Sequence, residues 1–542
     1  MSSPQFSVAE IHEAIAATRP DEVCLVHRDR RLTWAEVTDR TRRLANHLVA
    51  SGLGCHTERS ELQGHESGQD HLAIYLHNGN EYLEAMLGSF KARVAPFNVN
   101  YRYVAEELQY LLTDSRATAI VVHSQFTPTL AEVLPDLPNL RVILQVADES
   151  GLPLLPGAVW YEDALTDASG DRPAVEWSPD DLYILYTGGT TGMPKGVLWR
   201  NADANIECFG GSRAETLDGV VAEATGGLQA LLAPPFMHGA GHWMSFRTWN
   251  TGGTVFIQYH TDHLDPDDIW STIEREHLNF LLIVGDAFGR PLLDQLDRHT
   301  YDLSSLTVIL SGGAALSAPL KEQFLQQLPT VMIVDGLGSS EAGGQLSQVS
   351  AGAGATTGTF PISPGNHVLS DDLTRELAAG DPELGWLAKS GRLALGYLGD
   401  AAKTARTYPV IDGQRYAVPG DRARLRDDGI LELHGRDSVT ITSGGEKIFA
   451  EEVEAAVKAH PSVYDCVVAG RPSERWGNEV VAIVRIREGY EVDDEALRAE
   501  AERHIARYKL PKAFVYVPEV LRSPSGKADY RWAKQTAADA AG

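Results

Sequence analysis

Apolar and polar positions along the chain follow two alternating patterns. Short apolar runs, such as residues 72–76 and 119–122, are typical of buried strands. Between such runs, residues 81–92 and 318–327 carry apolar side chains at the spacing of one helix face, which predicts amphipathic helices. Because strands alternate with helices, we expect an α/β fold in which largely parallel sheets are buried.

Two helix starts carry a local signature. Ser7 with Glu10 and Thr33 with Glu36 have the spacing of capping boxes. After the second, one helix face would hold Trp34, Val37, Thr41, Leu44 and Leu48. Gly52 is a suitable stop, so a helix is predicted to end just before it.

The pattern changes towards the C-terminus. Residues 351–365 are rich in Gly, Ala, Thr and Pro, which predicts a connection, and short β segments follow it. Asp428-Gly429 lies between apolar runs and predicts a hairpin turn. The final stretch predicts a compact α+β unit, with strands at 439–442, 464–469, 480–486 and 513–517 and helices at 450–459 and 493–508.

The chain has 542 residues, which is too many for a single hydrophobic core. We predict a large N-terminal domain, residues 1–437, built of α/β sheets with a β-rich subdomain. Residues 438–542 are predicted to form a small α+β C-terminal domain.

Charge and cysteine content restrict the partners and the compartment. The formal net charge of −27 disfavours nucleic acid and anionic membrane surfaces as general partners. The cysteines show no CxxC pair and are expected to be small buried hydrophobes in a reducing compartment: Cys24, Cys55, Cys208 and Cys466. The start lacks a signal-peptide pattern and no apolar stretch is long enough for a membrane span, so a cytoplasmic location is expected.

A loop of Gly, Thr and Lys between two apolar runs is the most informative stretch. It contains Thr187, Gly188, Gly189, Thr190, Thr191, Gly192 and Lys195. Glycine backbone N–H groups, threonine hydroxyls and a lysine charge together can hold a polyphosphate. Pro194 before the lysine and Gly196 after it do not fit a Walker A loop, because that motif opens a helix. We interpret the stretch as strand, phosphate loop and strand; the alternative is an ordinary glycine-rich hairpin.

These residues closely resemble the signature loop of the adenylate-forming enzymes, which include acyl-CoA synthetases, peptide-synthetase adenylation domains and luciferases. Later motifs match this family in order and approximate spacing as far as Lys527. The resemblance implies that ATP contacts the loop residues and also Gly312, Gly313, Ala314, Ser340, Asp421, Arg436 and Lys527. The implied reaction joins a carboxylic acid to coenzyme A through an acyl-adenylate, with release of AMP and pyrophosphate.

Each motif has a plainer alternative. Glu341 after Ser340 would hold Mg²⁺ beside phosphate oxygens, or form a helix-capping pair with that serine. Ser311 to Ala314 resembles an adenine-side loop, or is a strand-to-helix turn. Asp421 would accept both ribose hydroxyls, or occupy a turn. Arg436 would reach the nucleotide, or form a surface salt bridge. Leu337 departs from the family, which usually has an aromatic there.

The resemblance also implies a mobile C-terminal domain. The hinge is placed at Asp437 and Ser438, to within about a residue. One face of the domain would deliver Lys527, whose ammonium offsets charge developing at the α-phosphate. Another face would bind the CoA arm through Ser443, Gly444, Gly445 and Trp476; the alternatives are a β-turn and a core or surface aromatic.

The acyl pocket is the least certain region in the sequence. His238 would approach the substrate carboxylate or gate the thiol, or serve as a structural histidine. Trp243, Asp286, Gly336 and Gly338 are further pocket candidates, or core residues. Residues 90–103 and 188–200 look most like actinobacterial acyl-CoA ligases, including those for steroid side-chain acids. Medium- or long-chain fatty acids are the alternative substrates, and a non-catalytic nucleotide sensor is an alternative function. No oligomeric state is determined; a homodimer is one option.

Overall fold

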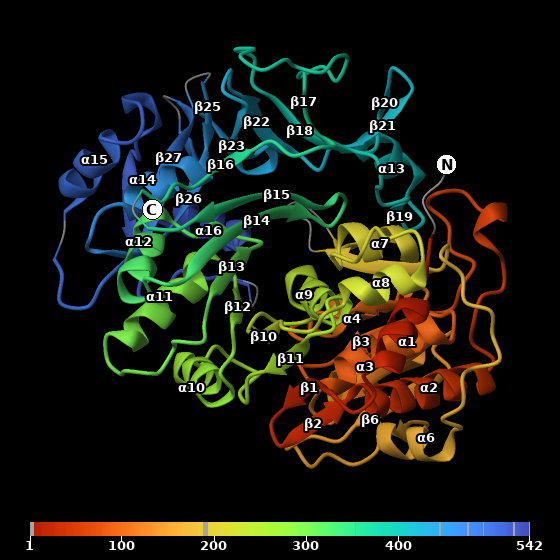
Figure 1. The fold of residues 1–542 in the computed structure, drawn as a ribbon. Coiled ribbons are helices and arrows are strands. Elements are labelled where there is room, and N and C mark those ends of the chain that lie inside the picture. Colours follow the sequence, from red (N-terminus) through yellow and green to blue (C-terminus); the bar gives the residue numbers. More distant parts are fainter. Residues whose placement is uncertain are drawn as a thin grey trace.

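The computed structural model describes residues 5–187, 193–352, 354–443, 446–473, 476–491, 493–523 and 526–540, with Ser438 described by its backbone alone. A large part built of two α/β sheets carries a β-rich part, and a small α+β part at the C-terminus packs against both (Figure 1). The predicted fold class is confirmed.

One α/β sheet has the strand order β19-β9-β8-β4-β3-β5-β6-β7. Its strands from β3 to β8 pair in parallel, and β9 runs antiparallel to β8. The strands are β3 (His71–Tyr75), β4 (Ala95–Asn98), β5 (Ala119–His123), β6 (Val142–Val146), β7 (Val159–Trp160), β8 (Leu182–Thr187), β9 (Lys195–Arg200) and β19 (Gly396–Tyr397).

The other α/β sheet has the order β15-β14-β13-β12-β10-β11-β1-β2, with antiparallel strands at both edges. Its members are β1 (Val23–His27), β2 (Arg30–Thr33), β10 (Gln229–Leu232), β11 (Thr254–Ile257), β12 (Phe280–Ile283), β13 (Val308–Gly312), β14 (Met332–Ser339) and β15 (Gly343–Ser350). The glycine-rich stretch at residues 335–339 resembles a turn in sequence, but it continues β14 because β15 pairs with it.

Helices cover both sheets, and α2, α3 and α9 contribute to one apolar cluster that joins the sheets. The helices of this large part are α1 (Val8–Thr18), α2 (Trp34–Ala50), α3 (Asn80–Lys91), α4 (Ala105–Asp114), α5 (Thr127–Val133), α6 (Tyr161–Asp167), α7 (Asn201–Glu207), α8 (Leu217–Glu223), α9 (Gly239–Asn250), α10 (Pro266–Glu276), α11 (Gly285–Leu296) and α12 (Ala318–Gln327). Short 3₁₀ turns lie at Arg59–Glu61, Ser124–Phe126 and Leu134–Asp136.

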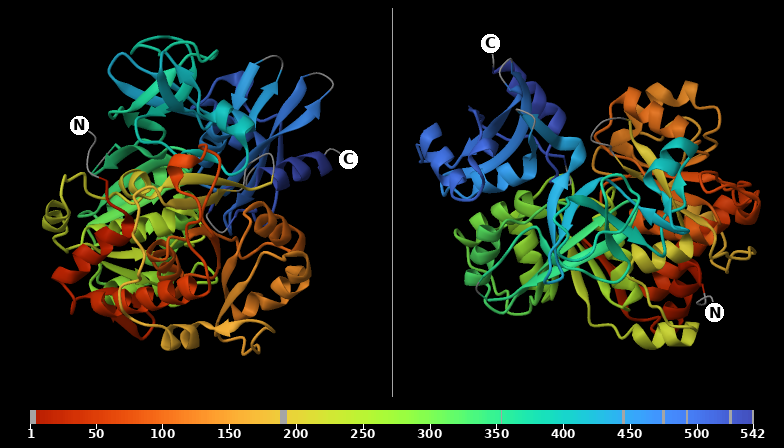
Figure 2. Two further views of the ribbon diagram at one scale, coloured as in Figure 1. Left: turned by 90° about the vertical axis from the view of Figure 1, so that its right-hand side faces the viewer. Right: turned by 90° about the horizontal axis from the view of Figure 1, so that it is seen from above.

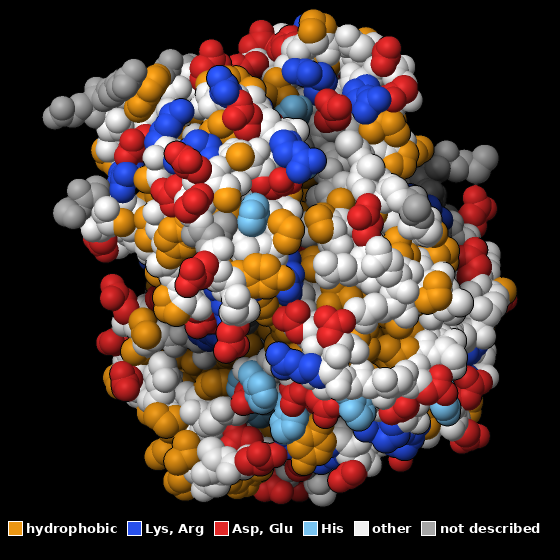
Figure 3. All heavy atoms as spheres, turned by 90° about the vertical axis from the view of Figure 1, so that its left-hand side faces the viewer, with side chains coloured by type: hydrophobic (Ala, Val, Ile, Leu, Met, Phe, Trp, Pro, Cys, Tyr) orange, Lys and Arg blue, Asp and Glu red, His pale blue; other side chains and the backbone are white. Residues whose placement is uncertain are grey.

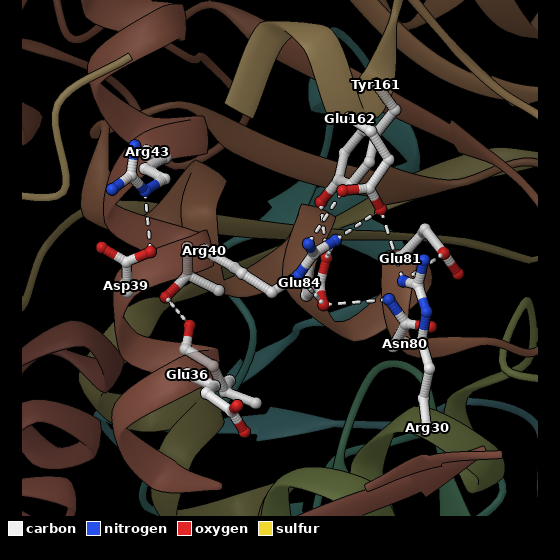
Figure 4. A network of polar contacts seen from close by, with 12 residues as sticks. Arg30, Glu36, Asp39, Arg40, Arg43, Asn80, Glu81, Glu84, Tyr161 and Glu162 are labelled. Carbon is white, nitrogen blue, oxygen red and sulfur yellow. Dashed lines mark hydrogen bonds and ion pairs between the residues drawn. The ribbon is translucent and has the colours of Figure 1, made fainter. Parts of the chain in front are cut away.

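The local helix signals are confirmed. Both capping boxes form, at Ser7 and at Thr33, and the predicted inner face of α2 is buried. The outer face of α2 meets α3 and α6 through charged groups, where Arg40 pairs with Glu84 and Glu162 (Figure 4). Glu84 is fully buried, and its ion pair with Arg40 offsets the free-energy cost of removing the carboxylate from water.

The β-rich part is a sheet of order β16-β23-β22-β18-β21-β20, with β17 added to β18. Its elements are β16 (Thr359–Pro361), β17 (Asn366–Leu369), β18 (Gly385–Ser390), β20 (Val410–Ile411), β21 (Gln414–Ala417), β22 (Asp421–Leu425) and β23 (Ile430–Arg436), with α13 (Ala401–Thr407) alongside. The predicted Asp428-Gly429 hairpin joins β22 to β23. Part of the predicted connection at 351–365 instead forms β16.

The C-terminal part follows a 3₁₀ turn at Asp437–Val439 and lies beside α11 and α12 (Figures 1 and 2). It contains β24 (Thr440–Ser443), β25 (Glu446–Phe449), α14 (Ala450–Lys458), β26 (Val463–Ser473), β27 (Gly477–Ile486), α15 (Asp494–Glu502), a 3₁₀ turn at Arg507–Lys509, β28 (Ala513–Tyr516) and α16 (Tyr530–Asp539). Two predictions were wrong here. The helix expected to reach residue 508 ends at Glu502, and α16, capped by Asp529, was not predicted.

Two further expectations can be compared with the described residues. No helix among them is both long and apolar enough to cross a membrane. Cys24, Cys208 and Cys466 are buried as predicted, whereas Cys55 is half-buried.

Candidate active site

The carboxyl ends of neighbouring strands bring several predicted residues to one edge of the second sheet. β13 ends at Gly312, and Gly313 follows with a φ of +89°. Gly336 and Gly338 lie on the adjacent β14, and Glu341 stands in the turn between β14 and β15. Ala314 and Ser340 continue these two turns. Ligands of α/β proteins bind at such strand ends, so the positions agree with a substrate site.

The turn that carries Glu341 is held by groups from the first α/β sheet and from the β-rich part. Its Oε1 accepts a hydrogen bond from the Tyr397 hydroxyl at 2.7 Å, and its backbone carbonyl accepts one from Tyr408 at 3.3 Å. The indole of Trp199 donates to the carbonyl of Ser340 at 2.8 Å. Lys403 places its ammonium 3.9 Å from the centre of the Tyr397 ring. The carboxylate of Glu341 is therefore fixed in orientation before any ligand binds.

Asp421 and Arg436 face one another across the predicted hairpin. Their Cα atoms are partners in the pairing of β22 with β23, and Arg436 Nε lies 3.3 Å from Asp421 Oδ1. Asp421 is buried, and its charge raises the pKa of Arg436. The predicted ribose carboxylate and nucleotide arginine thus form one ion pair at the edge of the site.

Lys527 reaches this site from the C-terminal part. A methyl group added to Gly313 would lie 3.8 Å from Cε of Lys527. Burial lowers the pKa of Lys527, Arg436 lowers it further, and Glu341 and Asp421 oppose that shift. The Lys527 side chain is nevertheless exposed to solvent, so a ligand can reach its ammonium. The structure therefore brings Lys527, Gly313, Arg436, Glu341 and Asp421 together.

His238 lies immediately before α9, near enough to Lys527 to feel its charge. Burial and the charge of Lys527 lower the pKa of His238 to about 3. The imidazole is therefore neutral at physiological pH, and its Nε2 has no hydrogen-bond partner among the described residues. A buried, unpaired ring nitrogen is costly, which favours a polar ligand at this position.

Trp243 lies on the first turns of α9, close to His238. A methyl group on Gly239 would meet the Trp243 ring at 3.1 Å, so the indole covers this backbone. Its Nε1 donates to the Tyr183 hydroxyl at 2.9 Å, and that hydroxyl also contacts His242. Trp243 is only half-buried, so part of this residue is open to solvent or to a ligand.

The described ends of the phosphate loop agree with the predicted strand–loop–strand arrangement. Thr187 and Lys195 are partners in the antiparallel pairing of β8 with β9. Lys195 Nζ lies 3.2 Å from Asp114 Oδ1, and the Tyr186 hydroxyl donates to the same carboxylate at 2.9 Å. The remaining predicted loop residues lie outside the described part of the chain: Gly188, Gly189, Thr190, Thr191 and Gly192.

The predicted CoA and hinge residues belong to the C-terminal part and its entry. Ser443 is buried at the end of β24, and Trp476 lies between β26 and β27 with Lys512 over its ring at 5.5 Å. Gly444 and Gly445 are outside the described residues. Asp437 Oδ1 lies 3.9 Å from both Arg422 and Lys447, one on each side of the predicted boundary. Of the predicted hinge pair, only Asp437 has a described side chain.

Asp286 occupies the domain interface. Its Oδ2 lies 2.8 Å from Nζ of Lys458 in α14, and its Oδ1 accepts from the Ser317 backbone N–H at 2.7 Å. The sequence had suggested a position along the acyl pocket. Lys458 and Tyr397 were not among the predicted site residues, because their partners Asp286 and Glu341 lie far away along the chain.

The surface that surrounds the domain contact carries charges of both signs. Figure 3 views the left side of Figure 1, with the C-terminal part above and α10 to α12 below. Acidic and basic side chains are interspersed on this face, whereas basic ones would dominate a nucleic-acid-binding face.

Comparison with known proteins agrees with this geometry. Residues 12–398 match the AMP-binding enzyme family, and residues 452–527 match the AMP-binding enzyme C-terminal domain. The medium-chain acyl-CoA ligase Mig of Mycobacterium avium is 53% identical over 540 residues, covering 98% of each chain. A 3-oxocholest-4-en-26-oate–CoA ligase of Rhodococcus rhodochrous is 38% identical over 546 residues, covering 98% of this chain and 95% of its own.

A solved structure supports the same fold at low sequence identity. The anthranilate CoA ligase AuaEII in complex with anthranoyl-AMP superimposes with a TM-score of 0.81 at 20% identity, covering 99% of this chain and 98% of that one. The predicted resemblance is thus confirmed over both domains. The chain belongs to the AMP-binding enzyme family, and within that family it is an acid–thiol ligase.

Proposed function

We propose that this protein is an ATP-dependent acyl-CoA ligase that acts on an apolar carboxylic acid. One observation carries the proposal: Cε of Lys527, from the C-terminal part, lies 3.8 Å from the position of a methyl group on Gly313, where the charges of Glu341, Asp421 and Arg436 act on it. A cation placed beside a nucleotide site can stabilise charge that develops on a phosphoryl group.

The reaction has two steps. A carboxylate oxygen attacks the α-phosphorus of ATP, the bond to the β-phosphate oxygen breaks, and pyrophosphate leaves. The sulfur of CoA then attacks the acyl carbon, AMP leaves with the bonding electrons, and the thiol proton passes to solvent. No side-chain nucleophile is required, since positioning and charge stabilisation lower the barriers.

The residues divide this work. Lys527 offsets charge at the α-phosphate, Asp421 accepts hydrogen bonds from the ribose, and Arg436 stands beside it. Neutral His238 offers a hydrogen bond to the acid or the thiol, because its low pKa excludes the charged form at neutral pH. Thr187, Lys195 and the loop between them hold the phosphates. In the second step the C-terminal domain turns about Asp437–Ser438 and presents Ser443, Gly444, Gly445 and Trp476 to CoA.

Glu341 is the residue that would hold a magnesium ion. Among the described residues no group of three or more His, Cys, Asp or Glu side chains could bind a metal by itself. A single oriented carboxylate is nevertheless enough, because Mg²⁺ in nucleotide sites takes its other ligands from phosphates and water. When bound, the ion would neutralise phosphate charge.

A medium-chain fatty acid is the proposed substrate, because the relative at 53% identity is a medium-chain ligase. A steroid side-chain acid is the second candidate, favoured by the relative that is a ligase for 3-oxocholest-4-en-26-oate. Trp243 and Gly336 would border the acyl group in either case, with Gly338 further along β14.

The test separates the two half-reactions. Lys527→Ala should lower pyrophosphate release with decanoate by about 100-fold or more, the usual cost of removing one such donor. It should leave thioester formation from supplied decanoyl-AMP and CoA unchanged. Lys534→Ala, an exposed lysine on α16, is the matched control. Equal loss of both steps in Lys527→Ala, or no activity of the wild type with any acid in a fatty, aryl and steroid panel, would contradict the proposal.

A further inference from the structure

The contact between the two domains has a charged centre next to the segment that follows β13. Asp286 stands on the first turn of α11, and Lys458 is the last residue of α14. Their Oδ2 and Nζ atoms are 2.8 Å apart, and the two side chains are only 7% and 12% exposed. An ion pair buried to this degree joins the domains at one defined position.

On the N-terminal side, Asp286 is tied to the segment that follows β13. Its Oδ1 accepts from the N–H of Ser317 at 2.7 Å, and its own N–H donates to the carbonyl of Ala315 at 3.2 Å. The preceding Gly285 donates its N–H to the Ser311 hydroxyl at 3.0 Å. The carboxylate is therefore rigidly placed relative to the adenine-side loop at residues 311–314.

On the C-terminal side, a second ion pair connects this region to the loop that carries Lys527. Arg522 binds Asp465 through two nitrogens at 2.7 Å, and its Nη1 donates to the carbonyl of Gly526 at 3.0 Å. The charges of Arg522 and Asp465 both act on Lys458, so the two pairs form one cluster.

The Lys527 loop docks on the turn of α11 that holds Asp286. A methyl group on Gly526 would lie 3.1 Å from both the Val284 carbonyl and Cβ of Ala287. Thus the Asp286–Lys458 ion pair and the close approach of Gly526 lie at neighbouring points on the first turn of α11. A further charged contact from α11, between Asp294 and Arg487, is longer at 3.9 Å.

We propose that Asp286 and Lys458 are positioning residues that hold Lys527 in the cleft for adenylate formation. The inference rests on the proposed two-step function. It predicts that the ion pair is made in the first half-reaction and broken in the second, when the C-terminal domain turns.

An ion pair suits this role better than an apolar contact. Its attraction roughly balances the cost of removing two charges from water, so separation of the domains returns both charges to solvent at little net cost. Removing one partner is different, because the docked arrangement would then bury an unpaired charge. Single substitutions should therefore disfavour the docked arrangement selectively.

The experiment measures both half-reactions for Asp286→Asn, Lys458→Met and the double variant. The asparagine is isosteric and keeps an acceptor for the Ser317 N–H. Each single variant should lower pyrophosphate release with decanoate by about tenfold or more, equal to about 1.4 kcal/mol, and leave thioester formation from supplied decanoyl-AMP unchanged. The double variant should lose less than the product of the two single losses, because it buries no lone charge.

Two controls distinguish positioning from general damage. Asp297→Asn lies at the end of the same helix and its carboxylate accepts a bond from Gln327 of the same domain, so it should behave as wild type. Lys458→Arg keeps the charge and should retain most of the adenylation rate. Thermal unfolding of every variant reports whether it is folded.

The outcomes of this experiment separate the positioning role from its alternatives. Selective loss of the first half-reaction supports the positioning role. An unchanged first half-reaction, or equal loss of both half-reactions in folded variants, would overturn it. If the wild type itself formed no acyl-adenylate with any acid, the proposed function would fail instead, so the two failures are distinguishable.

Discussion

Glu451, in the first turn of α14, offers a test of the domain contact that does not depend on catalysis. Its Oε2 accepts a hydrogen bond from the backbone N–H of Arg436 at 3.1 Å. Gly435, with a φ of +109°, lies so close to this carboxylate that a side chain there would collide with it. Burial and the charges of Glu454 and Asp421 raise the pKa of Glu451 from 4.5 to about 7.

The sign and size of the effect follow from this shift. Between about pH 4.5 and 7 the folded protein binds the Glu451 proton more tightly than the unfolded chain does, so stability falls as pH rises. The free energy of unfolding can fall by up to about 1.4 kcal/mol per pH unit and by about 3 kcal/mol in total. Because water reaches part of the half-buried side chain and screens its charge, we expect a total loss of about 2 kcal/mol in the free energy of unfolding.

Glu451→Gln keeps an acceptor for the Arg436 N–H and removes the charge. We expect wild type and variant to have similar stability at pH 5, and the variant to be more stable by about 2 kcal/mol at pH 8. Urea unfolding, followed by circular dichroism and tryptophan fluorescence, measures both proteins across this range. A constant difference between them from pH 5 to pH 8 would refute the assigned titration of Glu451.

Three further predictions concern the site and the interface. Tyr397→Phe removes the 2.7 Å hydrogen bond to Glu341 and should lower pyrophosphate release by about tenfold, with a greater magnesium requirement; an unchanged magnesium dependence would argue against Glu341 as the ligand. Trp243→Ala should raise kcat/KM for steroid acids relative to decanoate by about tenfold, since it removes the ring beside Gly239, and an unchanged ratio would place this ring outside the acyl pocket. The pKa of Asp286 is lowered by Lys458 against the effect of burial, and that of Lys458 is raised by Asp286 against burial. The ion pair therefore gives its full stabilisation between the unfolded pKa of Asp, 3.8, and that of Lys, 10.5. The ratio of the pyrophosphate-release rates of wild type and Asp286→Asn should accordingly be constant from about pH 5 to 9.

Local patterns in the sequence predicted the structure correctly wherever the contacts that determine it join residues close along the chain. The capping boxes at Ser7 and Thr33 need only residues three positions apart, and both form. The Asp428-Gly429 turn needs only its flanking strands. The phosphate loop, Glu341 and Lys527 were predicted from motifs, because the chemistry of phosphate binding requires particular residue types in a short stretch.

Local patterns predicted the wrong structure where contacts with residues distant in the sequence change the local conformation. Residues 335–339 look like a glycine-rich turn, but β15 supplies backbone partners that extend them as a strand. The predicted helix after residue 493 stops at Glu502, and a 3₁₀ turn follows at Arg507–Lys509. Such outcomes depend on neighbours that a local window does not contain.

From the sequence alone we could predict the family of this enzyme, most of its elements in order and candidate residues for the nucleotide site. The tertiary structure decided which of these residues meet one another. Glu341 and Tyr397 are 56 positions apart, and Asp286 and Lys458 are 172 apart. The physical reason is that a side chain's hydrogen-bond partner and its burial depend on how whole elements pack, so no periodicity or spacing encodes them.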